Sequence, residues 1–273
     1  MSFTRIGANI AALQSLNALL KVNSSIGSSL LKLSTGKRIN SVGDDAASFS
    51  LARGLEARRR SLQQALSNVG TAKNVLSIAE GGYLAISDLL QIIKEKTVQA
   101  ADDSYNASQR TAIQGQIDAL VQEIDAIVGE NQFQGTQLID GSFTGSKFQT
   151  GAAAGDVFTV TLANADSGAL SVNALVVDSA ANASTAIAAV DAAIDTLNSA
   201  AQTVGESLLR LSSKEDTLSV SITNTEAARS RIEDADFASE QANLVRNQII
   251  QQTAFSAFAQ ANAAPQLVLS LFR

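Results

Sequence analysis

Histidine, cysteine and tryptophan are absent from this chain of 273 residues. Without histidine or cysteine there is no imidazole acid–base catalysis, no thiol nucleophile, no Ser-His-Asp triad and none of the usual zinc sites. Aspartate, glutamate, lysine and tyrosine could still catalyse, but they form no clustered constellation in the sequence. We therefore expect no enzyme, no cofactor and no metal site.

Proline is almost absent, occurring once at Pro265, whereas average usage is about 5 %. The chain is rich in alanine and leucine, and this composition predicts long uninterrupted helices. The proline could either kink a helix or begin a last helical segment, where its missing N–H costs nothing.

Strong positive charge and long apolar runs are also missing. The formal net charge is −6, which argues against general affinity for nucleic acid. No run approaches 18 apolar residues, so membrane insertion is not expected. Residues 1–20 have neither the continuous apolar core nor the cleavage site of a secretory signal, so Sec-type export is not expected.

A heptad pattern of apolar residues dominates the rest of the sequence. It begins at Leu51 and continues in alternating steps of four and three to Ile93, with Arg58 as its polar member. This pattern predicts a coiled-coil helix of about 50 residues, roughly 75 Å long. After the polar stretch 101–109, a second series runs from Ile113 to Ile127, and a third extends over 187–225. The members of the third series are Ile187, Val190, Ile194, Leu197, Ala201, Val204, Leu208, Leu211, Glu215, Leu218, Ile222 and Thr225. These three helices are expected to pack as a bundle, with a hairpin between the first two.

The region between the second and third heptad series has a different character. Residues 129–182 are rich in glycine and contain short alternating runs such as KFQT and DVFTVTL, which predict strands. The sequence therefore predicts a mainly α fold, a long coiled-coil helical bundle with a small β-hairpin region at about 139–178 and paired N- and C-terminal helices.

Both chain ends have helical patterns with many apolar residues and few charges. A pair of such helices would leave large apolar faces in water, and exposed faces of that size mark interaction surfaces. We expect the two ends to meet and to assemble with other copies. The residues of this predicted assembly interface are Ile6, Ile10, Leu13, Leu20, Leu30, Leu33, Phe237, Leu244, Ile249, Phe255, Phe258, Leu267 and Leu271.

The stretch GKRINSVGDDAASFSLARGLEARRR (36–60) contains an acidic pair, Asp44 and Asp45. A metal or acid–base site would need a further ligand, and none lies nearby in the sequence. Helix initiation explains the pair better, with Asp44 as N-cap and Asp45 in the first turn, near the positive end of the helix dipole. Gly43, Asp44 and Asp45 are thus predicted to start the first long helix, with Gly36 and Gly43 supplying turns.

Three consecutive arginines, Arg58 to Arg60, follow in the same helix. Consecutive helical residues point about 100° apart, so they do not form one nucleic-acid patch. A solvated or inter-subunit face is the preferred interpretation.

Two long motifs at opposite ends of the chain resemble the bacterial flagellin family. LLKLSTGKRINSVGDDAASFSLARGL (30–55) resembles the N-terminal signature of that family. ARSRIEDADFASEQANLVRNQIIQQTAFSAFAQANAAPQLVLSLFR (228–273) resembles the C-terminal signature, and NQFQGTQLIDG (131–141) also fits. Only about 145–182 lacks a clear correspondence.

The resemblance implies an architecture and a function. Residues 1–43 and 233–273 would form the inner tube domain with its connector, and residues 44–232 would form a rod-shaped shell domain without large outer domains. The chain would be a structural subunit of the bacterial flagellar filament, a homopolymer used for swimming motility. In such an assembly Arg58 to Arg60 would face neighbouring subunits, with acidic partners in EDAD (233–236) or on neighbouring helices. It would be extracellular and exported unfolded through the type III export apparatus without a cleaved signal peptide. Further expected partners are an export chaperone and the flagellar cap and junction proteins.

The resemblance also permits a residue-level comparison. In many flagellins the vertebrate innate-immune flagellin receptor reads the segment aligned with QIIKEKTVQAADD (91–103) and one residue of the next helix. The positions that hold Arg, Leu and Glu in well-recognised members align here with Ile92, Lys96 and Gln116. All three differ, so weak or absent receptor binding is expected.

Two other functions fit the sequence less well. A hook–filament junction protein shares the terminal helices and the export route, but such proteins match the terminal motifs less completely. A coiled-coil signalling rod would leave the apolar ends and the glycine-rich β region unexplained.

Overall fold

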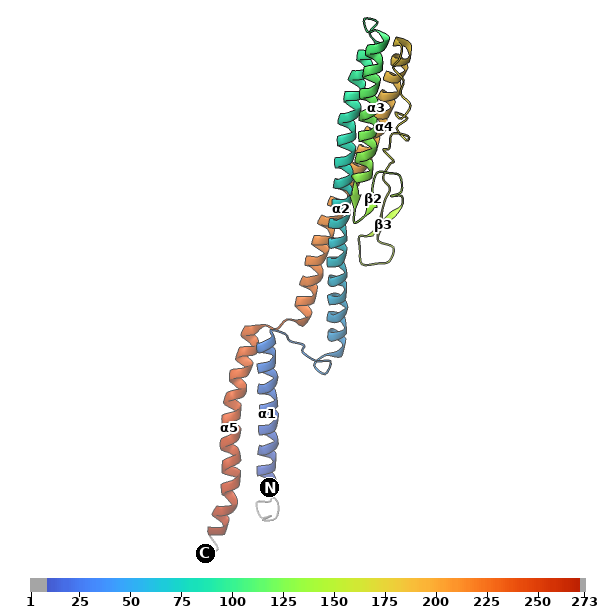
Figure 1. The fold of residues 1–273 in the computed structure, drawn as a ribbon. Coiled ribbons are helices and arrows are strands. Elements are labelled where there is room, and N and C mark those ends of the chain that lie inside the picture. The colour runs from blue at the N-terminus through green and yellow to red at the C-terminus, as the bar shows by residue number, and fades with distance from the viewer. Residues whose placement is uncertain (1–8, 271–273) are drawn as a thin grey trace. The chain divides into compact units, whose positions relative to one another are not determined.

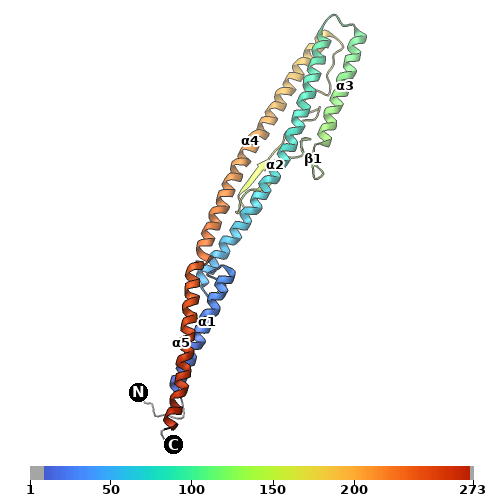
Figure 2. The same cartoon turned by 90° about the vertical axis from the view of Figure 1, so that its left-hand side faces the viewer.

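The computed structural model describes the backbone of residues 9–270 and the side chains of residues 9–263. The described residues form five helices and four short strands (Figures 1 and 2). The helices are α1 (Ile10–Thr35), α2 (Ala46–Ala101), α3 (Ala107–Glu130), α4 (Ala180–Glu233) and α5 (Phe237–Ser270). The strands are β1 (Gln132–Phe133), β2 (Thr136–Gln137), β3 (Ser146–Gln149) and β4 (Val157–Val160). This confirms the predicted helical fold with a small β region.

The chain divides into two compact units. The terminal unit contains residues 1–57 and 224–273, and the rod unit contains residues 58–223. In the rod unit, α3 and the corresponding parts of α2 and α4 lie side by side, with the strands next to them (Figures 1 and 2).

The turn between α2 and α3 is held by polar groups and confirms the predicted hairpin. Asn106 and Gln109 form a capping box, in which each side chain accepts a hydrogen bond from the other residue's backbone N–H. The buried guanidinium of Arg110 donates to the carbonyls of Ala100, Asp102 and Tyr105. These bonds satisfy carbonyls at and just beyond the C-terminal end of α2, which a helix otherwise leaves unpaired.

The first predicted heptad seam is the core of the rod unit. Its members on α2 are at most 6 % exposed from Leu62 onward, namely Leu62, Ala65, Val69, Ala72, Leu76, Ala79, Tyr83, Ile86, Leu90 and Ile93. The predicted start of this seam was wrong, since Leu51 is 56 % exposed and Ala52 beside it is buried. Leu51 belongs to the terminal unit, and a one-residue step turns a helical side chain by about 100°, so Ala52 is buried there while Leu51 points outward.

Of the two sets of residues that alternate in the predicted seam of α4, one is buried as predicted and the other is displaced by one residue. Val190, Leu197, Val204, Leu211 and Leu218 are buried as expected. The residues buried between them are Ala186, Ala193 and Ala200, whereas the predicted Ile187, Ile194 and Ala201 are half-buried. A helix between several partners buries a stripe wider than a two-position seam, and the small alanines permit close helix approach at its centre.

The β region consists of two antiparallel hairpins. β1 pairs with β2, and β3 pairs with β4 in a register that places Phe148 opposite Phe158. The runs KFQT and DVFTVTL therefore contain strands, as predicted. Leu138 and Ile139 follow β2 and are completely buried, so this region packs on the helical core. Gly82 of α2 permits the close approach, because a Cβ there would lie 2.3 Å from Nδ2 of Asn131.

Within the described part of the chain, one helix is long and apolar enough to cross a membrane by length and composition alone. An 18-residue window of α2 has a mean hydropathy of 1.3, although the sequence contains no continuous apolar run of that length. Core helices of soluble proteins meet the same criterion, and 39 % of this window is buried inside the protein. The apolar side chains of α2 form the seam described above, so protein packing accounts for its hydropathy.

Tyr83 provides a test of this core. It is 1 % exposed, its hydroxyl donates to the carbonyl of Ala163 at 2.6 Å, and burial raises its pKa to about 12. We expect Tyr83→Phe to lower the free energy of unfolding by about 1 kcal/mol, because the hydrogen bond that the tyrosine hydroxyl donates to Ala163 is lost. Urea unfolding followed by circular dichroism measures this. The matched control Leu84→Ala removes a side chain that is 57 % exposed and should change stability by less than about 0.5 kcal/mol.

Candidate assembly surface and its connector

The terminal unit is built on the pairing of α1 with α5, which lie alongside each other in both views (Figures 1 and 2). α1 begins after Asn9, whose side chain accepts a hydrogen bond from the N–H of Ala12. It ends at Gly36, which has φ 69° and forms a left-handed C-cap. Glycine adopts this conformation without the steric cost that a Cβ would add. α5 continues past Pro265 to Ser270, so the proline does not begin a separate helix.

The contact line between the two helices is itself a heptad seam. The more buried residues of each helix recur in alternating steps of three and four, as expected when one stripe faces a partner. On α1 they are Ala12, Ser15, Leu19, Val22, Ile26, Ser29 and Leu33, and on α5 they are Glu240, Leu244, Asn247, Gln251, Ala254, Phe258 and Ala261. This seam contains small and polar residues as well as apolar ones.

Most of the predicted assembly residues point away from this seam. Ile10, Leu13, Leu20, Leu30, Phe237, Ile249 and Phe255 are 50 % to 66 % exposed. Leu33 and Phe258 are half-buried and Leu244 is 6 % exposed, so these three serve the pairing of α1 with α5. Ile6, Leu271 and the side chain of Leu267 lie outside the described residues.

The structure adds apolar residues that the predicted list omitted. Leu31 is 50 % exposed and Ile250 is 43 % exposed, each beside a residue of that list. Exposed apolar residues of α1 and α5 form what we call the outward apolar faces, namely Ile10, Leu13, Leu20, Leu30, Leu31, Phe237, Ile249, Ile250 and Phe255. Their signal in the sequence was adjacency: paired apolar neighbours cannot both lie on one narrow seam.

The acidic pair in the connector has two structural roles. Oδ2 of Asp44 accepts hydrogen bonds from the N–H groups of Asn40 and Ser41, at 2.9 and 2.8 Å, and closes the turn. Oδ1 of Asp45 accepts from the N–H of Ser48 at 3.1 Å, which makes Asp45 the N-cap of α2. The prediction that Asp44 caps the helix was therefore wrong by one residue. Gly43 does not have a positive φ, unlike Gly36.

Hydrogen bonds shift both carboxyl groups toward the ionised form. The backbone N–H of Asn40, followed by that of Ser41, lowers the pKa of Asp44 below its ordinary value. The side chain and then the N–H of Ser48 lower the pKa of Asp45. Both carboxylates are thus used by the local backbone, which is a structural role.

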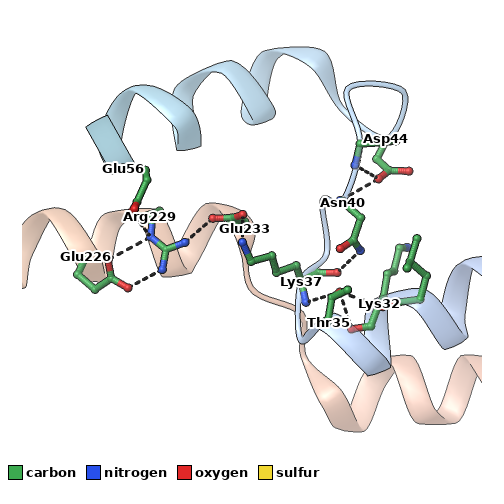
Figure 3. A network of polar contacts seen from close by, with 11 residues as sticks. Lys32, Thr35, Lys37, Asn40, Asp44, Glu56, Glu226, Arg229 and Glu233 are labelled. Atoms are coloured by element: carbon green, nitrogen blue, oxygen red, sulfur yellow. Dashed lines mark hydrogen bonds and ion pairs between the residues drawn. The ribbon is translucent and has the colours of Figure 1, made fainter. Parts of the chain in front are cut away.

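Glu233 lies at the centre of an ion-pair network that joins the connector to the end of α4 (Figure 3). Its Oε1 is 2.6 Å from Nζ of Lys37, and its Oε2 is 2.5 Å from Nη1 of Arg229. Arg229 also pairs with Glu226 at 2.5 Å and lies 3.7 Å from Glu56 of α2. Two backbone bonds run alongside, from Arg38 N–H to Glu233 at 2.7 Å and from Ala235 N–H to Gly36 at 2.9 Å.

The network favours its charged forms. Partial burial opposes ionisation of Glu233, but hydrogen bonds from Lys37 and Arg229 outweigh it and hold the pKa of Glu233 below its usual value. Hydrogen bonding to Glu226, and secondarily to Glu233, raises the pKa of Arg229. Within EDAD (233–236), Glu233 therefore has its ion-pair partners in its own chain.

Of the three consecutive arginines, Arg59 donates a hydrogen bond to Gln63 on the same helix.

The receptor-equivalent positions lie on the rod unit. Ile92 is 40 % exposed and Lys96 is half-buried on α2, about one turn apart. Gln116 is exposed on α3.

Known proteins are similar in sequence to this one over nearly the whole chain. The bacterial flagellin N-terminal helical region matches residues 6–144, and the bacterial flagellin C-terminal helical region matches residues 187–272. Flagellin FlaB2 of Treponema pallidum (strain Nichols) is 34 % identical over 286 residues, covering 98 % of this chain and 99 % of that protein. The flagellin of Bacillus subtilis (strain 168) is 34 % identical over 303 residues, covering 98 % and 100 %.

Two further similarities agree with these. The flagellar filament 33 kDa core protein of Treponema phagedenis is 33 % identical over 286 residues, covering 98 % of this chain and 99 % of that protein. A proposed flagellar hook-associated protein from Vibrio parahaemolyticus has a solved structure that covers 70 % of this chain and 100 % of its own, with a TM-score of 0.58. At 15 % identity, this likeness shows a shared fold alone.

Paired helices with outward apolar faces are typical of structural proteins that associate with other copies. The chain belongs to the bacterial flagellin family. It is a structural subunit of the extracellular flagellar filament and not an enzyme.

Acid is expected to weaken the connector. Because the folded-state pKa of Glu233 is lowered, its stabilisation is present above the unfolded-state pKa of about 4.3 and is lost as the pH falls through the lower folded-state value. Asp44 and Asp45 act in the same direction. Glu233→Gln should be less stable than the parent at neutral pH and lose less stability below about pH 4.

Urea unfolding at a series of pH values compares the two proteins. The matched control is Asp234→Asn, which changes an exposed neighbouring acid and should keep the acid dependence of the parent. Identical pH profiles for the parent and Glu233→Gln would contradict the assigned role of Glu233.

Proposed function

We propose that the outward apolar faces of α1 and α5 join neighbouring subunits and form the inner tube of the filament. In this proposal residues 1–43 and 233–273 make the tube domain and its connector. Residues 44–232 make the surrounding shell, with a β region at about 139–178. The observation that carries the proposal is the exposure of Ile249 and Phe255, each 59 %, on a helix whose other side already has a partner.

The energetics support assembly rather than a soluble pair. Fully burying one large apolar side chain contributes about 1.5–3 kcal/mol. The outward apolar faces contain several such residues on each helix. Single exposed apolar residues are normal on a monomer, whereas a group of this kind marks an interaction site. Part of the gain is offset by ordering the helices when a subunit docks.

The contacts between subunits are proposed to be heterologous. A head-to-tail contact that does not close into a ring generates an open helical filament, whereas a self-complementary contact stops at a dimer. α1 and α5 differ in sequence and so supply two different apolar faces, as a heterologous contact requires.

Gly43, Asp44 and Asp45 are proposed to start the shell helix and to hold the connector in the same form in every subunit. The support is that both carboxylates bind N–H groups of adjacent residues and need no partner from another copy.

Further partners follow from membership of the family. We propose export as an unfolded chain through the flagellar type III apparatus, without a cleaved signal peptide and with an export chaperone. Flagellar cap and junction proteins are the proposed contacts at the ends of the filament. A chain without cysteine cannot form disulfides that would hinder threading, which supports this route.

The proposed tube is tested by removing apolar surface from α5. Ile249→Ser combined with Phe255→Ser should abolish or strongly reduce polymerisation, because each serine removes most of one buried contact. Sedimentation and electron microscopy of the purified chain measure filament formation. The matched control, Gln248→Ser combined with Gln252→Ser, alters exposed polar positions of the same helix and should leave polymerisation intact.

Two results would contradict the proposal. Normal filaments from the apolar variant would show that the outward faces are not the subunit contact. If the parent chain formed no long filaments alone, a role at the hook–filament junction would be favoured instead.

Weak or absent activation of the vertebrate innate-immune flagellin receptor is also proposed. The support is the divergence at Ile92, Lys96 and Gln116, two of which lie one turn apart on α2. Purified monomer should activate a receptor reporter line weakly, and Ile92→Arg, Lys96→Leu and Gln116→Glu together should raise activation at least about tenfold, an increase of roughly 1.4 kcal/mol in binding. Strong activation by the parent at low concentration would overturn this proposal.

A further inference from the structure

Polar side chains occupy the line along which α1 and α5 face each other. Glu240, Asn247 and Gln251 lie on the seam of α5, and Ser15 and Ser29 lie on that of α1. Apolar residues such as Leu19, Leu244 and Phe258 share this seam, while the residues of the outward apolar faces are 43 % to 66 % exposed. In an ordinary two-stranded coiled coil apolar residues fill nearly all seam positions, so the polar residues here depart from that pattern.

Three hydrogen bonds cross between the helices within the described residues. They are Asn9 Nδ2 to the carbonyl of Ala261 at 2.8 Å, Gln251 Nε2 to Asn23 Oδ1 at 2.6 Å, and Ser29 Oγ to Glu240 Oε1 at 2.6 Å. The residue numbers of the bonded residues rise from 9 to 23 to 29 on the side of α1, while those of their partners fall from 261 to 251 to 240 on α5. All three therefore belong to one antiparallel register.

The bond between Ser29 and Glu240 is the most selective of the three. Ser29 is 4 % exposed, and Glu240 carries the only acidic side chain in residues 10–35 and 237–270. Sliding one helix by a turn moves the partners about 5.4 Å apart and leaves a carboxylate without its donor against the other helix. Small seam residues such as Ala12 and Ala254 offer little steric resistance to sliding.

We propose that Ser29 and Glu240 determine the register of the α1–α5 pair, and thereby which outward residues each subunit presents to its neighbours. The physical basis is that a polar group on a helix–helix seam penalises wrong registers more than it stabilises the right one. This role rests on the proposed use of the two helices as the tube, since register matters when other copies must match it.

The absence of cysteine makes the register directly measurable. Asn23→Cys with Gln251→Cys reports the native register, because these side chains are in contact. Asn23→Cys with Asn247→Cys or with Ala254→Cys reports a slip of about one turn in either direction. Replacing Asn23 removes one of the three bonds and leaves the bonds Asn9–Ala261 and Ser29–Glu240 in every reporter. Substituting Ser29 and Glu240 in these reporters then isolates the contribution of that pair. Non-reducing gels separate intramolecular from intermolecular disulfides, and filaments are scored independently by electron microscopy.

We expect the native pair to cross-link preferentially in the parent sequence. Adding Ser29→Ala and Glu240→Ala should lower the ratio of native to slipped cross-links about tenfold, which corresponds to roughly 1.4 kcal/mol. The matched control, Ser28→Ala with Gln241→Ala, changes exposed neighbours and should keep the parent ratio.

An unchanged ratio in the Ser29/Glu240 variant overturns the proposal, as does an equal drop in the control or no preference in the parent. If the protein with the two reporter cysteines and with Ser29 and Glu240 unchanged forms no filaments in the electron microscope, the proposal that α1 and α5 form the tube is contradicted. The cross-link ratio of the soluble chain then still decides the register.

Discussion

The two terminal helices carry more apolar surface than one copy of the chain can cover. Their contact with each other uses one stripe of each helix, and residues such as Leu13, Ile249 and Phe255 remain on the outside. Water penalises such surface in proportion to its area. Association with further copies would remove this penalty, which is the physical basis of the proposed tube.

The connector meets a different requirement, because it must place charged residues without leaving any of them unpaired. Lys37 and Arg229 surround Glu233, while Asp44 and Asp45 bind N–H groups of their own turn and helix. Partly buried ion pairs of this kind add little net stability but penalise other arrangements. Local pairing also means that each subunit can form the connector without help from a neighbour.

Much of the fold follows from periodicity. The heptads on α2 from Leu62 onward, the hairpin after Ala101 and the strands in KFQT and DVFTVTL all appear where the sequence predicts them. The predictions are wrong by one residue where two adjacent residues could each fill the same position in the structure. Asp45 rather than Asp44 caps α2, and Ala193 rather than Ile194 is buried in α4. A one-residue step turns a helical side chain by about 100°, so neighbours with similar chemistry are resolved only by the partner helix.

The sequence by itself determined the class of fold, the family and the presence of apolar residues beyond one seam on the terminal helices, because these depend on composition, motifs and repeat. Only the tertiary structure decided which apolar residues pair α1 with α5 and which point outward. It also revealed that Ser29 and Glu240, distant in the chain, form a hydrogen bond on that seam. The physical reason is that the sequence specifies the stripe of a helix, whereas the rotation and register of two paired helices depend on contacts between distant residues.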